Sequence, residues 1–458
     1  MSFMPVMLWS DALVFLIITV LLASAFVIRR REHLLLPWQR VAKSRMAMLS
    51  LLVLSLFVLV GLLDTLHFRS ALPAQNSLEK VYSTEVLSVF DVLVTPLRTH
   101  SEKTYSAPFA LTLFAKESFT DAQGLVRRDY PRLQFGGAHL SDEAQRGRDV
   151  WQRASLGGLL GLLLGVMLLV GWAYLPTRND RVNNAAQRCP PYALVSVLLT
   201  TTLLGAVSNL ATVYHVLGTD KVGIDVLYLS LKSIRTGLII GTVTTLVTLP
   251  LALFLGVAAG YFRGWVDDVI QYVYTVLSSI PSVLLIAAAV LMMQVTIDTH
   301  PQWFATAASR ADVRLVFLCL ILGMTSWTGL CRLLRGETLK LREMEYIQAA
   351  QAFGVSNLRI LSRHIIPNVM HIILIALVMD FSGLVLAEAV LSYVGVGVDP
   401  SMISFGTMIN GARQEMGREP MVWWSLAAAF FFMLILVLAA NLFADAVRDA
   451  FDPRMKQT

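Results

Sequence analysis

Residues 46–66 read MAMLSLLVLSLFVLVGLLDTL, an apolar run whose only charged side chain is Asp64. A helix of roughly 20 apolar residues is long enough to cross the hydrocarbon core of a bilayer. Similar runs recur along the chain and predict nine membrane-spanning helices, at about 12–28, 46–66, 155–175, 193–214, 236–259, 268–293, 313–331, 369–392 and 423–446. We therefore expect an all-α fold, a polytopic membrane helix bundle.

The composition also indicates a membrane protein. Of the 458 residues, 56% are hydrophobic and 15% are charged, with a mean hydropathy of +0.65, whereas soluble domains carry about 25% charged residues. The net charge of +6 could indicate a nucleic-acid partner, but the basic residues lie in short loops, where they orient helices in the membrane. We expect contact with membrane lipid and none with nucleic acid. Cys189, Cys319 and Cys331 lack the spacing of a metal site or a disulfide framework.

The positions of the basic residues predict the orientation of the helices. Asp11 precedes the first apolar run and Arg29–Arg31 follow it, the reverse of a secretory signal peptide. We therefore expect a retained helix with its N-terminus outside, in the periplasm. Alternate crossing then places the loops 29–45, 176–192 and 332–367 inside, and these loops are rich in Lys and Arg. The C-terminus is cytoplasmic by the same reasoning, in a multi-pass protein of the cell inner membrane.

Sequence signatures of nucleotide and metal chemistry are missing. The chain contains no G-x-x-x-x-G-K-[ST] phosphate loop, no H-E-x-x-H pair and no glycine-rich strand-to-helix turn. We expect no catalytic residue, no metal and no cofactor in this chain. If a nucleotide drives its activity, ATP is bound and hydrolysed by a separate partner chain.

The most informative polar stretch is residues 345–368, EYIQAAQAFGVSNLRILSRHIIPN. It predicts a helix, a turn and a second helix, with Gly354 in the left-handed conformation that ends the first helix. Ala350, Phe353 and Leu358 would form an exposed apolar edge. The residues alone leave two interpretations open: a knob that docks in the groove of a partner, or a helical loop in the lipid interface.

This stretch resembles the EAA signature of ABC importer permeases, in which a Glu-Ala-Ala triplet is followed by glycine and later by a His-Ile-Leu-Pro-like end. The matching positions are Gln348-Ala349-Ala350, Gly354 and His364-Ile365-Ile366-Pro367, with Gln348 where the family usually has glutamate. Glu345-Tyr346, just before the triplet, also fits the family. The resemblance implies an ATPase-coupling loop that uses Glu345, Gln348, Ala349, Ala350, Gly354 and Pro367.

Further motifs are similar to those of the C-type permeases of dipeptide and oligopeptide importers. They are Trp38-Gln39-Arg40, Ser44-Arg45-Met46, Gly218-Thr219-Asp220, Gly260-Tyr261-Phe262-Arg263-Gly264, Ala387-Glu388-Ala389, Phe405-Gly406-Thr407-Met408 and Arg448-Asp449. The resemblance covers about 38–66 and 215–455. It implies translocation of short peptides or related small solutes. It also implies an assembly with a second permease subunit, two cytoplasmic ATP-binding-cassette ATPases and a periplasmic substrate-binding protein.

The same resemblance divides the chain into three parts. Residues 1–66 hold an N-terminal extra helix and the first family-like helix. Residues 67–214 hold an inserted periplasmic segment plus two extra helices, and 215–458 form the ABC permease core with the coupling loop in 332–367. Because the insertion adds one crossing in each direction, it leaves the orientation of the core unchanged.

Asp380 and Glu388 fall within the predicted helix 369–392. An ionisable group in a span is costly, on the order of 2.5–3.5 kcal/mol at its centre, and tends to face a cavity or a partner. Both residues are candidates for the translocation pathway. For Glu388, which lies near the outer end and matches the family pattern, a structural hydrogen bond is the alternative. Pro250 and Pro281 interrupt backbone hydrogen bonding, and we interpret both as structural kinks.

Two other classes of function remain open. In an ion-coupled secondary transporter, Asp380 and Glu388 would carry protons. A non-transporting membrane scaffold or sensor would be built on the segment 67–154. Neither needs a loop shaped for an ATPase, so the coupling motif favours the importer.

Overall fold

The computed structural model describes residues 3–30, 32–71, 82–120, 126–140, 142–174, 191–304 and 306–451. Within these residues, nine helices are long and apolar enough to cross a membrane. They are α1 (Trp9–Arg29), α3 (Arg45–Asp64), α6 (Arg146–Tyr174), α7 (Pro191–Ala211), α8 (Val226–Phe262), α10 (Ser282–Thr299), α11 (Ala307–Arg342), α14 (Ile366–Val394) and α16 (Trp424–Phe451). The predicted helix bundle is confirmed. Cys189, most of the predicted loop 176–192 and the C-terminal residues 452–458 lie outside the described residues.

The remaining elements are short. The helices are α2 (Glu32–Lys43), α4 (Val89–Leu93), α5 (Thr95–Thr99), η1 (Glu143–Gln145), α9 (Gly264–Ser279), η3 (Pro301–Trp303), α12 (Glu345–Ala352), α13 (Asn357–Ile360), η4 (Leu361–Ile365) and α15 (Phe405–Glu415). The strands are β1 (Phe3–Val6), β2 (His67–Ser70), β3 (Leu87–Ser88), β4 (Glu117–Thr120) and β5 (Val126–Asp129). They form a three-stranded sheet in the order β1-β2-β3 and a separate β4–β5 hairpin.

The prediction of a single spanning helix at 268–293 is wrong. The chain forms two helices there, α9 and α10, and only α10 is long and apolar enough to span. Ile280 between them is extended, with ψ of 132°. Proline has no N–H for the helix ladder and its ring pushes the preceding residue out of the helical region, so Pro281 ends the first helix rather than kinking a longer one. Pro250, in contrast, lies inside α8, which continues past it.

Helix α8 is the centre of the core and packs along α11, with α3 and α14 also against it. Two glycines on α8 let the backbones of α8 and α11 approach closely. A Cβ at Gly256 would lie 2.8 Å from the carbonyl oxygen of Cys331, and one at Gly260 would lie 2.7 Å from that of Arg335. Small residues of this kind are the usual means by which membrane helices pack.

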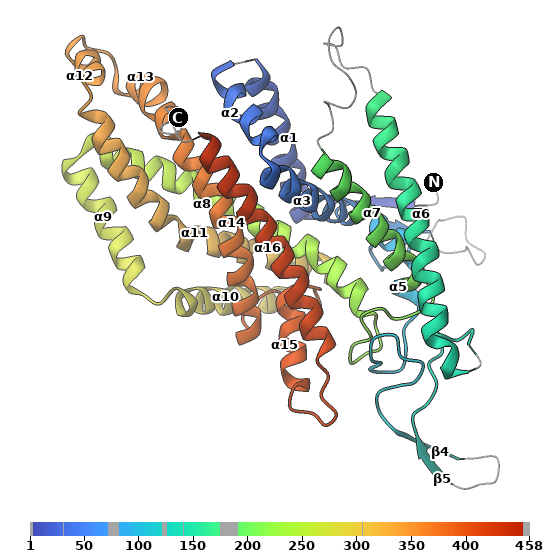
Figure 1. Cartoon of the computed structure of the whole chain (residues 1–458). Coiled ribbons are helices and arrows are strands. Elements are labelled where there is room, and N and C mark those ends of the chain that lie inside the picture. Colours follow the sequence, from blue (N-terminus) through green and yellow to red (C-terminus); the bar gives the residue numbers. More distant parts are fainter. Residues whose placement is uncertain are drawn as a thin grey trace.

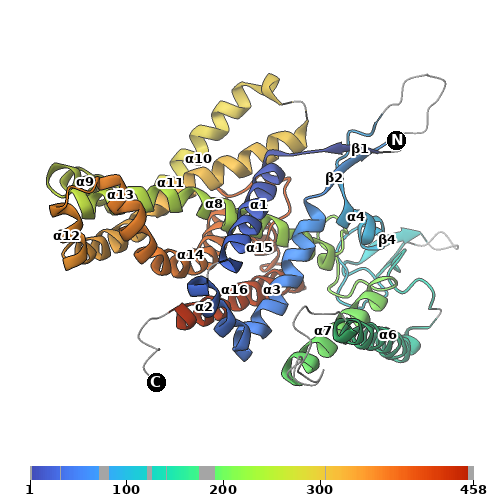
Figure 2. The same ribbon diagram turned by 90° about the horizontal axis from the view of Figure 1, so that it is seen from above.

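Helices α6 and α7 form a hairpin at the margin of the bundle, on the opposite side from α9 and α12 (Figure 1, Figure 2). Gly157, Gly161 and Gly165 on α6 face Thr201 and Gly205 on α7, and a Cβ at any of these three glycines would clash there. The hairpin is therefore held by close backbone contact between its own two helices.

The two ends of the bundle carry different structures (Figure 1). The loop formed by α12 and α13 projects at one end, which we term the loop end. The described residues of 67–140, which we term the module, lie at the other, the module end. The N-terminal strand β1 pairs antiparallel with β2 of the module. The N-terminus and the inserted segment, which the sequence separates, therefore share one sheet.

Candidate coupling loop and translocation pathway

The loop between α11 and α14 has the predicted helix–turn–helix shape. Helix α12 ends at Ala352, and Gly354 adopts the predicted left-handed conformation, with φ of 72°. The Val355 N–H donates to the carbonyl of Ala350 at 3.1 Å, which closes the end of the helix. The second helix differs from the prediction, because α13 is followed by the π-helical turn η4 and then runs directly into α14.

The inner face of the loop is anchored on α8. Ile347, Ile360 and Ile365 are fully buried and pack against the α8 residues Val257 and Tyr261. The hydroxyl of Tyr261 also donates to Oδ1 of Asn357 at 2.9 Å. Burial of a large aliphatic side chain is worth roughly 1.5–3 kcal/mol. Three such side chains hold the loop in one position against the end of α8.

The outer face of the loop exposes apolar side chains. Phe353 is 87% exposed and Leu358 is 79% exposed, on either side of the Gly354 turn. The prediction that Ala350 belongs to this edge is wrong, because Ala350 is half-buried and packs against the inner cluster. Unlike the exposed apolar side chains of the spanning helices, Phe353 and Leu358 project from a loop at the end of the bundle, where a partner can cover them. We define the exposed edge as Phe353 and Leu358.

The remaining predicted coupling residues lie around this edge. Glu345, Gln348 and Ala349 are exposed on α12, and Pro367 is exposed in the first turn of α14. Gln348 donates from Nε2 to the carbonyl of Glu343 at 3.3 Å. The sequence-predicted loop residues are thus brought together on one projection, with Ala350 turned inward.

Asp380 lines a cavity of about 480 Å³ between α11, α14 and α16. Arg448 of α16 is the other charged residue of its wall, and apolar side chains such as Leu330 and Met379 supply much of the rest. Within the described residues Asp380 makes no hydrogen bond or ion pair. The carboxylate therefore faces open space rather than a protein partner, as an ionisable group on a solute path would.

Glu388 has a different environment although it lies on the same helix. It is 2% exposed. Its Oε1 accepts hydrogen bonds from the hydroxyls of Ser392 at 2.7 Å and Ser404 at 2.9 Å. Because Ser404 caps the N-terminus of α15, Glu388 links α14 to the start of α15. It does not line the Asp380 cavity.

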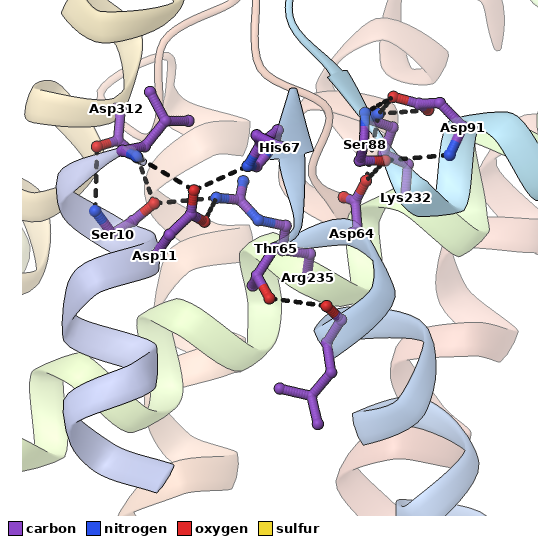
Figure 3. A network of polar contacts seen from close by, with 12 residues as sticks. Ser10, Asp11, Asp64, Thr65, His67, Ser88, Asp91, Lys232, Arg235 and Asp312 are labelled. Carbon is purple, nitrogen blue, oxygen red and sulfur yellow. Dashed lines mark hydrogen bonds and ion pairs between the residues drawn. The ribbon is translucent and has the colours of Figure 1, made fainter. Parts of the chain in front are cut away.

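A buried charge network at the module end was not foreseen from the sequence (Figure 3). Arg235 of α8 donates to Asp11 of α1 at 2.6 Å and to the hydroxyl of Ser10 at 3.0 Å. Ser10 donates in turn to Asp312 of α11, and His67 of β2 lies 2.8 Å from Asp11. A buried charge must be paired to be tolerated. This network therefore fixes the N-terminal helix against the core.

A second network joins the module to α8 (Figure 3). Lys232 lies 2.6 Å from Asp91 of α4 and 3.3 Å from Asp64 of α3. Ser88 donates to Asp64 at 2.6 Å. Burial disfavours the Asp91 carboxylate, but the charge and hydrogen bonds of Lys232 outweigh this and lower its pKa. The signal available in the sequence was two basic residues, Lys232 and Arg235, directly before a predicted span.

His215 forms the third link between the module and α8. Its Nδ1 lies 2.7 Å from Asp225, the N-cap of α8, and its Nε2 lies 3.5 Å from Glu102 of the module. Burial opposes its protonation, but the hydrogen bond with Asp225 and the negative charges of Asp225 and Glu102 raise the pKa of His215 to about 9. Burial also opposes ionisation of Glu102, yet hydrogen bonds from His215 and from the N–H groups of residues 134–136 lower its pKa to about 2.

Comparison with known proteins agrees with this architecture. Residues 252–457 match the family described as binding-protein-dependent transport system inner membrane component. The oligopeptide transport system permease protein OppC of Mycobacterium tuberculosis is 34% identical over 239 residues, which are 52% of this chain and 76% of that protein. The dipeptide transport system permease protein DppC of Bacillus subtilis is 25% identical over 316 residues, which are 68% of this chain and 86% of that protein.

A solved structure is also similar. The methionine ABC transporter MetNI, in an inward-facing conformation, aligns with a TM-score of 0.38 at 17% identity, over 49% of this chain and 98% of the other.

The polytopic bundle and the helical loop on its end define an integral-membrane transport permease. The chain belongs to the binding-protein-dependent transport family, in the group of dipeptide and oligopeptide ABC importer permeases. It is a multi-pass protein of the inner membrane and forms the transmembrane pore subunit of an ABC importer. In this family the permease associates with ATPase and substrate-binding partners.

Proposed function

We propose that this chain pairs with a second permease subunit, two cytoplasmic ATP-binding-cassette ATPases and one periplasmic substrate-binding protein. The complex translocates short peptides or related small solutes across the inner membrane. The names of the relatives support this substrate class, since they are oligopeptide and dipeptide permeases. ATP is bound and hydrolysed in the partner chains, and this chain is a transport subunit without an enzymatic activity of its own.

The observation that carries the proposal is the exposed edge. Phe353 and Leu358 project from a loop whose inner face is fully packed against α8. A rigid base with an uncovered apolar tip suits a groove in a partner, and force applied to the tip passes directly into α8 and α14. We therefore assign the edge to the ATPase, which moves the loop when it binds ATP and switches the pore between inward-facing and outward-facing states.

The orientation follows from the same assignment. The loop end faces the cytoplasm, where the ATPases are, and the module end faces the periplasm. The N-terminus lies in the periplasm because β1 is part of the module sheet. Arg29 and Arg448, each in the last turn of its helix, support this orientation.

Asp380 is assigned to the translocation pathway. It lines a cavity and has no partner among the described residues, so it is free to meet a solute or its water shell. For Glu388, the two hydroxyl bonds favour a structural role over contact with the solute.

The coupling assignment is tested by Gly354→Val. A Cβ at Gly354 would meet nothing within 4 Å, so the substitution acts only through the left-handed backbone, which a β-branched residue adopts at a cost. We expect insertion in the membrane to be normal. ATPase co-purification should fall at least about fivefold, which corresponds to ~1 kcal/mol. ATP-driven peptide uptake should fall with it.

Gly395→Val is the matched control. Gly395 also has a positive φ, of 91°, and open space around its Cβ, but it ends α14 at the module end. Valine at position 395 imposes the same kind of backbone strain without touching the loop, so ATPase co-purification should be retained. Normal ATPase binding and uptake in Gly354→Val would show that the coupling assignment is wrong. Uptake driven by an ion gradient without ATP would then be the next measurement.

A further inference from the structure

A second cavity, of about 390 Å³, opens at the module end. Parts of the chain that are distant in sequence form its wall, among them Leu229 of α8 and Val422. Tyr105 comes from the module, residues 220–224 from the turn before α8, and residues 400–415 from α15 and the segment before it. Cavities that bind small molecules in proteins begin at about 300 Å³, so this one has the volume for a small solute.

The module completes the wall through Tyr105, which is 5% exposed. Its ring packs edge-on against Trp424 at 6.5 Å, and the guanidinium of Arg418 lies over the same ring at 5.5 Å. Trp424 donates from Nε1 to the carbonyl of Thr219 at 2.9 Å. Glu415, the other carboxylate of the wall, pairs with Arg418 at 3.3 Å.

Asp220 is the exception in this wall. Its Oδ1 accepts from the N–H groups of Val222 at 2.9 Å and Ile224 at 2.8 Å, which forms the turn before α8. Within the described residues it has no ion pair. Burial raises its pKa, despite these bonds. The side chain is therefore a partly desolvated carboxylate that lacks a cation, and such a group favours a cationic ligand.

The rest of the lining restricts the body of the ligand. Leu229, Met408 and Val422 are apolar, and the exposed Lys221, which makes no ion pair with Asp220 among the described residues, also lines the cavity. An ammonium group with a small, partly apolar body complements this arrangement, and a carboxylate at the other end of the ligand would meet Lys221.

We propose that this cavity binds the amino-terminal ammonium group of a short peptide at Asp220, as a site that receives the solute before it enters the pathway. The site is built jointly by the insertion and the permease core. The proposal rests on the proposed function, because it takes the module end as the side from which the solute arrives.

The test is protection of a single cysteine in the cavity. Gly411 lines the cavity, and a Cβ there meets nothing within 4 Å, so Gly411→Cys is sterically tolerated. Cys319 and Cys331 are buried, so only Cys189 is replaced by serine. The full complex in membranes is labelled with an impermeant thiol reagent in the presence of millimolar dialanine or N-acetyl-dialanine.

We expect dialanine to slow the labelling of Gly411→Cys about fivefold or more at a concentration several times its Kd. N-acetyl-dialanine, which has no ammonium group, should not protect. Cysteine at Gly417, which also has open space but does not line the cavity, should label equally with and without peptide.

Asp220→Asn in the Gly411→Cys background should weaken protection about tenfold, because the amide keeps the turn acceptor but removes the charge. Asp142→Asn is the matched control, since Asp142 also accepts a turn N–H, from Ala144 at 3.1 Å, but lies away from the cavity.

Equal protection by both peptides, or none by dialanine, would overturn the proposal. ATP-driven uptake of dialanine in the same membranes distinguishes failure of the binding site from failure of the proposed transport function. Uptake without protection refutes this site alone, and protection without uptake refutes the proposed function alone.

Discussion

At the residue scale, His215 joins parts of the chain that lie more than 100 residues apart, namely Glu102 in the module and Asp225 at the start of α8. Two carboxylates beside one imidazole favour its protonated, positively charged form even in a buried site. The carboxylate of Glu102 also accepts from three successive N–H groups of residues 134–136. One buried histidine therefore holds two segments of the module against the core.

The pH dependence of this attachment follows from the two shifted groups. His215 has a pKa of about 9 in the folded protein against 6.5 when free, so its contribution is complete below about pH 6.5 and is lost as the pH rises through 9. Glu102 has a pKa of about 2 against 4.5, so its contribution is complete above pH 4.5 and is lost as the pH falls through 2. We expect the firmest attachment between about pH 4.5 and 6.5, and a loss on the order of 3 kcal/mol above pH 9.

Hydrogen exchange of the amides of residues 134–136, corrected for the intrinsic pH dependence of exchange, measures this change. His215→Gln should remove the decline between pH 6.5 and 9. His100→Gln, at a module histidine that stacks on Phe135 at 4.7 Å, should leave the profile unaltered. An identical decline in His215→Gln and the wild type would contradict the assignment.

At the element scale, helix α14 carries two carboxylates in opposite circumstances. Asp380 and Glu388 are eight residues apart, a little over two helical turns. Asp380 opens onto a cavity, whereas Glu388 binds two serine hydroxyls. The same helix thus presents one carboxylate to a cavity and uses the other to hold α15.

Alanine substitutions should separate these roles. Glu388→Ala leaves two buried hydroxyls without an acceptor and should destabilise the protein by about 1–3 kcal/mol. Asp380→Ala removes no hydrogen bond or ion pair among the described residues and should change stability by less than about 0.5 kcal/mol, while altering the transport rate. Thermal unfolding in detergent and ATP-driven uptake in proteoliposomes measure the two quantities. A lower melting temperature with unchanged uptake in Asp380→Ala would remove it from the pathway.

At the scale of the whole molecule, the module, the N-terminal strand and α15 lie at one end and the α12–α13 loop lies at the other (Figure 1). The charge networks of Arg235, Lys232 and His215 all lie at the module end. The module is connected to α3 and α8 by buried ion pairs. It is therefore part of the packed structure and not an appendage.

Single cysteines test the orientation. Ser101 is exposed in the module and Ser362 is exposed in the loop. With an impermeant thiol reagent and cells whose outer membrane alone is permeabilised, Ser101→Cys should be labelled and Ser362→Cys should not. Both should be labelled once the inner membrane is opened, which controls for accessibility. Labelling of Ser362→Cys alone in the first condition would reverse the proposed topology.

Much of the fold could be predicted because it depends on local properties of the chain. Apolar runs must form helices in a bilayer, where backbone groups have no other partners, and the nine spans follow from this. Gly354 was also predictable, since only a residue without Cβ readily adopts its φ of 72°. The break at Pro281 was missed because the apolar run continues through it. Hydropathy describes only the polarity of side chains and does not show where the backbone cannot continue as a helix.

The sequence by itself was enough to predict most of the apolar helices and the left-handed turn at Gly354, because each depends on neighbours along the chain. Only the tertiary structure decided which charged groups meet. Arg235 and Asp11 are 224 positions apart, and no local pattern links them. The same holds for the cavity that Tyr105 completes with Asp220. Whether a carboxylate such as Asp380 or Glu388 faces space or a hydroxyl depends on which helices pack beside it, and packing is a property of the assembled bundle.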